Sequence, residues 1–122
     1  MLIALFTILL LGGSNTGMLD YIADTRDDVK SVMERGERRS DALSTLKAMK
    51  KRSDARNKVV KRSAEELTWL LSQDDIQESD FDIIWFGYFA EREAYNKDML
   101  ELRFQLREQL TREEWEQVFG EE

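Results

Sequence analysis

The chain has no cysteine, no histidine and no proline, and only six glycines among its 122 residues. Without cysteine, disulfide and thiolate chemistry is excluded. Without histidine, the chain lacks the commonest metal ligand and the commonest general base. The absence of proline and the scarcity of glycine disfavour sheets with tight turns and favour long helices. The composition therefore predicts an all-α protein.

The first nineteen residues carry no charged side chain, and residues 2–11 form an apolar run interrupted only by Thr7. A run of this length suits the core of a signal peptide, whereas a membrane-spanning helix needs about 20 apolar residues. Two interpretations are favoured for residues 1–19, a cleaved signal or an uncleaved membrane anchor; the third, a buried core helix, would need a larger domain to surround it. In either case the expected membrane segment comprises Leu2, Ile3, Leu5, Phe6, Ile8, Leu9, Leu10 and Leu11.

The two interpretations lead to different locations for the rest of the chain. A signal sequence implies export, or an inner-membrane anchor with the chain facing the periplasm. Arg26 and Lys30 follow the apolar run and no basic side chain precedes it, a pattern that favours a cytoplasmic C-terminus. We expect a membrane-associated or exported protein, with the cytoplasmic face as the alternative.

The charged residues divide the chain into a basic part and an acidic part. Residues 20–62 hold 13 basic and 8 acidic side chains, and residues 63–122 hold 5 basic and 17 acidic ones. Opposite charge should bring the two parts together as antiparallel helices, within one chain or in a dimer. We expect a basic long helix or helix pair over 20–62 and an acidic helical hairpin over 63–122.

In the basic part, apolar residues recur in steps of three and four from Leu19 and again over 40–62, as in amphipathic helices. Gly36 either ends the first helix or lies inside one rod over residues 20–62. Ser63 and Glu66 match a capping box, which either starts a new helix or lies within a longer one.

In the acidic part, residues 73–79 are the best candidate for a loop, and Ser79 is expected to cap a helix over 80–110. The apolar residues of that helix lie close to a heptad seam, which indicates coiled-coil packing. Thr111 and Glu114 form a second capping box, and it predicts a short C-terminal helix ended by Gly120.

Catalytic chemistry is not expected. No nucleophile and base pair can be built on histidine or cysteine, and the paired carboxylates lie at helix starts, where acidic side chains stabilise the helix dipole. The acidic residues over 74–82 fail the calcium-loop pattern. We therefore expect no enzyme activity, no metal, no cofactor and no catalytic residue.

Two clusters of side chains are candidate contact surfaces. The basic tract over 47–62 can pair with the acidic helices, lie on anionic lipid or bind an acidic protein; nucleic acid is not expected, because the whole chain is acidic. The aromatic cluster over 81–89 can be buried between helices or can dock a partner. The candidate partner-binding residues are Trp85, Tyr88, Phe89, Lys50, Lys51, Arg56 and Lys61.

Residues 63–120 resemble the Spy/CpxP group of exported helical proteins. The resemblance comprises Leu70-Leu71, an acidic loop, a helix ending in residues 102–107, and Leu110-Thr111 followed by Glu114. The motif of that group is Leu-Thr-x-x-Gln, and Glu114 replaces its glutamine. The resemblance implies a curved helical hairpin that binds unfolded clients or a membrane signalling partner. Its metal-sensing branch uses histidine ligands, which this chain lacks.

Together these features predict an N-terminal hydrophobic helix followed by long helices in an antiparallel hairpin or bundle. The expected function is that of a chaperone-like or stress-sensor-like binding protein, membrane-anchored or exported and forming homo-oligomers. The alternative is a structural coiled-coil subunit of a larger membrane complex.

Overall fold

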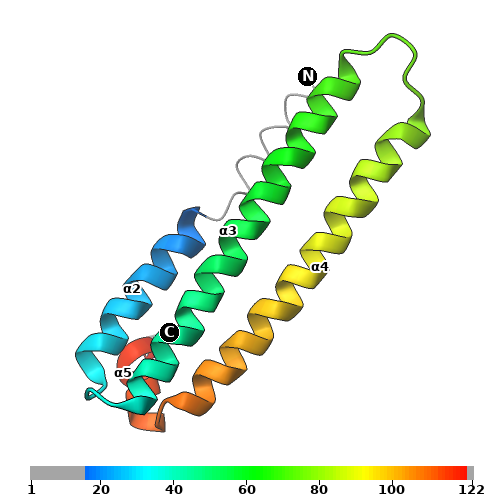
Figure 1. Ribbon diagram of the computed structural model, residues 1–122. Helices are drawn as coiled ribbons and strands as arrows, with labels where there is room; N and C mark the ends of the chain where they lie inside the picture. The colour runs from blue at the N-terminus through cyan, green and yellow to red at the C-terminus, as the bar shows by residue number, and fades with distance from the viewer. Residues whose placement is uncertain (1–15, 121–122) are drawn as a thin grey trace.

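The computed structural model describes residues 16–120, which form four helices and no strand. Helix α2 covers Thr16–Val32, α3 Glu37–Leu71, α4 Glu78–Gln109 and α5 Arg112–Phe119. Helices α3 and α4 form a long antiparallel hairpin (Figure 1), so the all-α hairpin expected from the sequence is confirmed for this part of the chain.

The apolar run from Leu2 to Leu11 lies outside the described residues, so the hydrophobic N-terminal helix stays a prediction. Among the described helices, none combines the length and the hydropathy that crossing a membrane requires.

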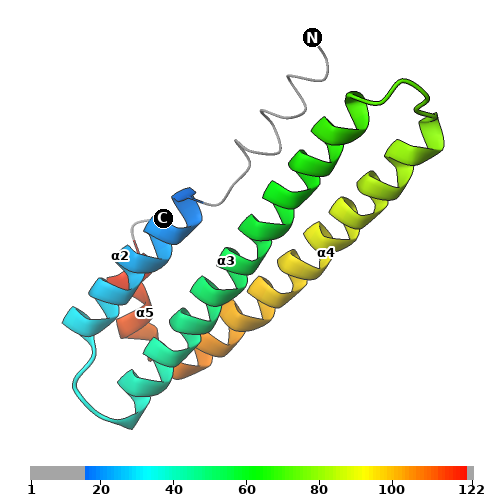
Figure 2. The ribbon, with the colours of Figure 1, turned by 45° about the horizontal axis from the view of Figure 1, so that its top comes forward.

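Helices α2 and α3 are two separate elements. Helix α2 ends at Val32, and a short connection leads to Gly36, the residue that precedes α3 and has an extended backbone (Figure 2). The alternative of one continuous rod over 20–62 is therefore wrong. An isolated rod would be marginal in water, whereas folding back buries Ile22, Val29 and Met33 of the first segment.

In the acidic half, the cap predicted for α5 is confirmed and the cap predicted for α4 is wrong. Ser79 lies inside the first turn of α4, which is preceded instead by Gln77, whose backbone N–H donates to the Asp80 carboxylate at 2.9 Å. The prediction of Ser79 as the cap is therefore wrong. At α5 the capping box is confirmed, because the Glu114 backbone N–H donates to Thr111 Oγ1 at 3.1 Å.

Ser63 does not start a helix, because α3 passes through it and continues to Leu71. The Ser63 side chain is instead buried on the face of α3 that packs against α4. Helix α3 thus crosses the boundary at 62 and 63 between the basic and acidic parts of the chain.

The core has two apolar clusters, one towards each end of the hairpin. At the end where four helices meet, the buried residues are Ile22, Val29, Met33, Ala42, Leu46, Tyr95, Met99, Leu106 and Leu110. Near the 72–77 loop, where the hairpin consists of α3 and α4, they are Val60, Ala64 and Leu67.

Polar side chains separate the two clusters. The hydroxyls of Ser53 and Tyr95 are hydrogen-bonded at 3.0 Å in the interior. Arg56 is only 7% exposed, and its guanidinium lies 4.9 Å from the Tyr95 ring centroid and 5.9 Å from that of Tyr88. The middle of the hairpin is thus a polar layer, defined here by Ser53, Arg56, Tyr88 and Tyr95.

Candidate binding groove

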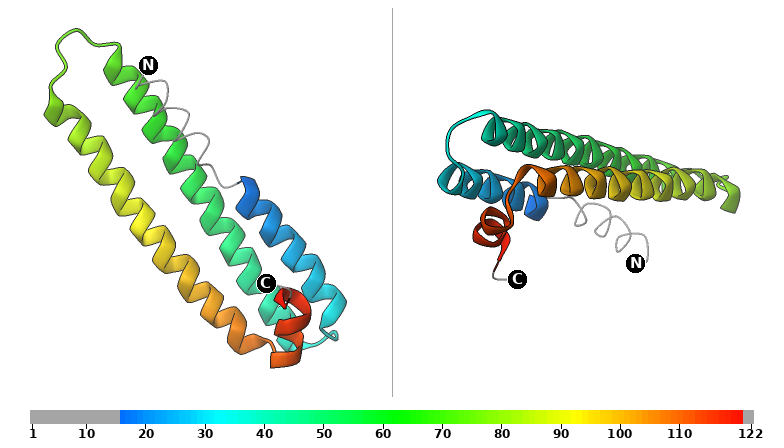
Figure 3. Two further views of the ribbon diagram at one scale, coloured as in Figure 1. Left: turned by 180° about the vertical axis from the view of Figure 1, so that it is seen from behind. Right: turned by 90° about the horizontal axis from the view of Figure 1, so that it is seen from below.

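A groove is lined by residues of α2, of the connection after it and of α3, and Figure 3 shows these two helices side by side. It encloses about 840 Å³. Its apolar lining comes from Leu19 and Ile22 on α2 and from Leu43 and Leu46 on α3. These residues recur in steps of three or four on each helix, which turns them towards the junction of the two helices.

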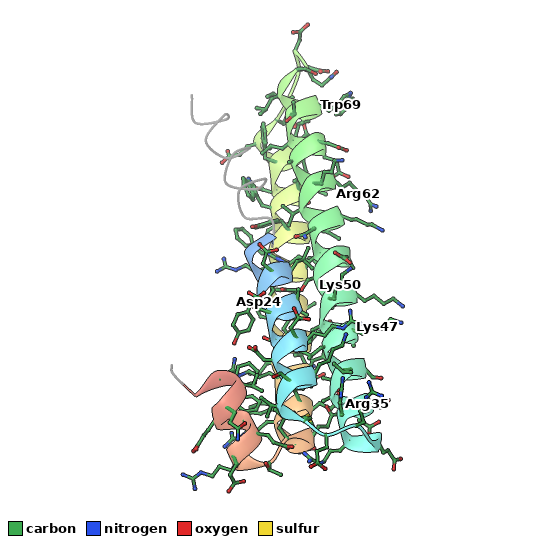
Figure 4. The ribbon with its side chains drawn as sticks, turned by 90° about the vertical axis from the view of Figure 1, so that its left-hand side faces the viewer. Asp24, Arg35, Lys47, Lys50, Arg62 and Trp69 are labelled. Atoms are coloured by element: carbon green, nitrogen blue, oxygen red, sulfur yellow. The ribbon has the colours of Figure 1, made fainter. Side chains whose placement is uncertain are left out.

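The charged lining of the groove has predominantly one sign. Six cations line it against one carboxylate, that of Asp27; the cations are Arg26, Lys30, Arg35, Arg39, Lys47 and Lys50. Figure 4 shows Arg35, Lys47 and Lys50 projecting to the same side of the molecule. Within residues 16–120, only Lys50 among the six is held in an ion pair, with Asp54 at 3.0 Å.

The basic candidates of the sequence are divided by the fold. Lys50 lines the groove, whereas Lys51 and Lys61 are exposed elsewhere on α3. Arg56 does not reach the surface, because it is buried in the polar layer. Arg52, from the same tract, turns inward and pairs with Glu91 at 2.7 Å and with Asp98 at 2.8 Å on α4.

The aromatic candidates are also divided. Trp85 and Tyr88 are partly buried against the cluster near the 72–77 loop. Phe89 is 49% exposed, and its ring stacks on that of Trp85 with centroids 5.9 Å apart. The two most exposed aromatic side chains were not among the candidate partner-binding residues; they are Phe86, which belongs to the aromatic cluster over 81–89, at 73% and Trp69 at 64% exposure.

Several acidic residues serve as helix caps or ion-pair partners. Asp80 caps α4, and the Glu114 carboxylate accepts the Thr111 backbone N–H at 2.8 Å. No group of three or more carboxylate side chains within residues 16–120 is arranged to hold a metal ion.

At the end of the hairpin where the four helices meet, an ion pair between Arg38 and Glu114 joins α3 to α5. Arg38 donates to both carboxylate oxygens of Glu114, and its Nη2–Oε2 distance is 2.9 Å. Arg38 also donates to the backbone carbonyl of Gln109 at 3.2 Å. The hydrogen bonds from Arg38 lower the pKa of Glu114 from 4.5 to about 2, and burial partly opposes this change.

The groove itself was missed by the sequence reasoning, because four of its six cations lie before residue 47. A signal was present: Arg26 and Lys30 are four residues apart on α2, and Arg39, Lys47 and Lys50 recur on α3, so each set shares one face of its helix. The two faces meet only because the connection at 33–36 reverses the chain, and that reversal was one of two open alternatives.

Comparison with known proteins does not place the chain in a family: no family model, no curated protein and no solved structure matches it. The geometry of residues 16–120 defines a class of helical protein with a long hairpin and a basic groove whose floor is apolar.

Proposed function

We propose that this chain is a non-enzymatic binding protein, membrane-anchored or exported through residues 1–19, that holds an acidic, amphipathic segment of a client or partner protein in the groove between α2 and α3. The observation that carries the proposal is the lining of the groove, with six cations and one carboxylate around an apolar floor. Cations flanking an apolar strip match a helix or chain that presents acidic and apolar residues together.

The uneven charge of the molecule supports this assignment. The chain as a whole has a formal net charge of −7. The groove differs from the rest of the chain, because six cations and only one carboxylate line it. Such a local field steers a negatively charged segment towards the groove and keeps it from the acidic faces. Lys51 and Lys61 are further exposed cations on α3, outside the groove.

The test is binding of a fluorescent peptide built from glutamate and leucine at helical spacing to the purified chain. Lys47→Glu should weaken binding about tenfold, because a favourable charge becomes an unfavourable one beside the ligand. The matched control is Arg92→Glu, an equal change of charge at an exposed position of α4 outside the groove. Equal affinities of the two variants would contradict the groove as the binding site.

A second comparison separates a protein ligand from a lipid surface. Vesicles of anionic phospholipid replace the peptide in the same assay. Tighter binding to vesicles than to the peptide, lost in the Lys47→Glu variant, would assign the groove to lipid headgroups and overturn the protein ligand.

The proposed location has its own test, which uses reporters fused after Glu122 that are active only outside or only inside the cytoplasm. We expect the external reporter to be active. An active cytoplasmic reporter would overturn export and favour a membrane-tethered coiled-coil subunit.

A further inference from the structure

Helix α4 has a second apolar seam on the side that faces away from α3. The residues of this outer seam follow one another in steps of three, four, three, four, three and four: Ile83, Phe86, Ala90, Glu93, Lys97, Leu100 and Phe104. Alternating steps of this kind are the heptad spacing of a coiled coil. All seven residues are exposed; the large side chains reach 75% for Ile83, 73% for Phe86 and 53% each for Leu100 and Phe104.

No described helix covers the outer seam. Helix α4 forms one long edge of the molecule in Figure 1, and α2 lies beside α3 at the opposite edge. The seam from Ile83 to Phe104 is about 32 Å long at 1.5 Å per residue. An exposed apolar row of this length indicates an interaction surface, and the following two features identify its occupant.

The outer seams of two copies of α4 are complementary when the two helices run antiparallel. If two copies of α4 pair antiparallel with Tyr95 at the level of the two-fold axis, Phe86 of one copy lies opposite Phe104 of the other. In the same register Ala90 lies opposite Leu100. Each of these layers occurs twice, as the symmetry of an isologous dimer requires.

The charged pair at the centre selects this orientation and register. In the antiparallel arrangement Glu93 lies opposite Lys97 of the second copy, and the layer is repeated across the axis. A parallel arrangement would instead place Glu93 against Glu93 and Lys97 against Lys97, and like charges in contact are unfavourable. A shift by seven residues would place Glu93 against Phe104 and Lys97 against Leu100, which buries charges among apolar side chains.

In the described part of the monomer, Glu93 and Lys97 are not engaged in ion pairs, and small residues leave space for a second helix beside the seam. Within residues 16–120, neither Glu93 nor Lys97 takes part in an ion pair. Ala90 in the seam and Gly87 and Ala94 beside it are small exposed residues, and space is open beside Gly87. Small residues at these positions allow two helices to approach closely.

We infer that the chain forms an antiparallel homodimer through the outer seam of α4, with Glu93 and Lys97 as its central reciprocal ion pairs. This interface goes beyond the proposed function, because the groove is lined by α2, the connection after it and α3, and not by α4. The dimer presents two grooves on opposite outer sides, and a partner with two acidic segments can therefore engage both at once.

The test is the mass of the purified full chain in solution, measured by sedimentation over a range of concentrations. Glu93→Lys places two lysines opposite each other in each central layer, and Lys97→Glu places two glutamates there. Each single change should weaken dimerisation about tenfold or more. The double change Glu93→Lys with Lys97→Glu should restore it, and an equimolar mixture of the two single variants should form mixed dimers.

Cross-linking tests the register. Because the chain has no cysteine, an introduced pair is unique. Mild oxidation of a mixture of Ala90→Cys and Leu100→Cys chains should give the mixed cross-link in large excess over either self-cross-link. Self-cross-links in excess would indicate a parallel pair and overturn the proposal.

Other outcomes also decide the matter. A monomeric wild-type chain at every concentration overturns the dimer. A dimer whose mass is unchanged by either single charge reversal overturns the seam, and it assigns the contact to another surface such as residues 2–11. The groove variant Lys47→Glu should leave the mass unchanged, so failure of the dimer and failure of peptide binding are distinguishable.

Discussion

Replacing Glu114 with glutamine tests the ion pair that joins the start of α3 to α5. The carboxylate accepts hydrogen bonds from Arg38 and from the Thr111 backbone N–H. These bonds lower the pKa of Glu114 from 4.5 to about 2. Glu114→Gln keeps the size of the side chain and removes the charge, so the change isolates the electrostatic part of the contact.

The magnitude follows from the pKa and the exposure of the pair. A pKa change from 4.5 to about 2 corresponds to at most about 3 kcal/mol of unfolding free energy. The side chain of Arg38 is 50% exposed and that of Glu114 is 14% exposed. Because solvent screens such a pair, we expect a loss of about 1 kcal/mol for Glu114→Gln at neutral pH.

The pH dependence gives the direction of the effect. Since the folded-state pKa of Glu114 lies below its unfolded value, the contribution is complete above pH 4.5 and is lost as the pH falls towards about 2. The difference in unfolding free energy between wild type and Glu114→Gln should therefore be largest near pH 7. It should vanish at the acid end of this window.

The assay is urea denaturation followed by circular dichroism at a series of pH values. The matched control is Glu113→Gln, which removes the same charge from the same first turn of α5 at an exposed position. The reasoning is refuted if both variants lose the same stability, or if the difference for Glu114→Gln is as large at pH 2 as at pH 7.

Three further changes probe the interior by the same denaturation assay. Leu46→Ala should cost about 2–5 kcal/mol because it opens a cavity in the four-helix end, whereas Trp69→Ala at 64% exposure should cost little, and equal costs would contradict the burial of Leu46. Tyr95→Phe should cost about 1–2 kcal/mol, because Ser53 loses its buried hydrogen-bond partner; no loss would mean that this bond is replaced by another. Arg56→Met should leave stability unchanged or raise it, because the buried guanidinium has one nitrogen without a hydrogen-bond partner; a large loss would show that its contacts with the tyrosine rings are dominant.

The helices of the acidic half were predictable because their signals are local. The capping box at Thr111 depends on residues three apart, and the mostly polar stretch after Leu71, with Asp74 and Asp75, marks the turn. The loop expected over 73–79 is found over 72–77. At Ser79 the local signal failed because a carboxylate, Asp80, was equally able to accept a backbone N–H.

The burial of Arg56 was not predicted, although its position on α3 held a signal. Arg56 continues the row of buried residues formed by Leu46, Ser53 and Val60, at steps of three, four and seven. Arg56 was nevertheless predicted to be exposed, because arginine is rarely buried without a partner. The two tyrosine rings that accommodate it lie on α4, and no local pattern in α3 reveals them.

The attraction between the basic and acidic parts of the chain involves only some of the basic side chains. The cations that reach across to the acidic helices are arginines, Arg38 and Arg52, which pair with three carboxylates. Arginine is less strongly hydrated than lysine and forms two directed bonds to a carboxylate, so it is the cation better suited to packed interfaces. The lysines remain exposed, and six cations line the groove between α2 and α3. Because different cations stabilise the fold and line the groove, a change at Lys47 should alter binding while leaving the unfolding free energy within about 0.5 kcal/mol of wild type.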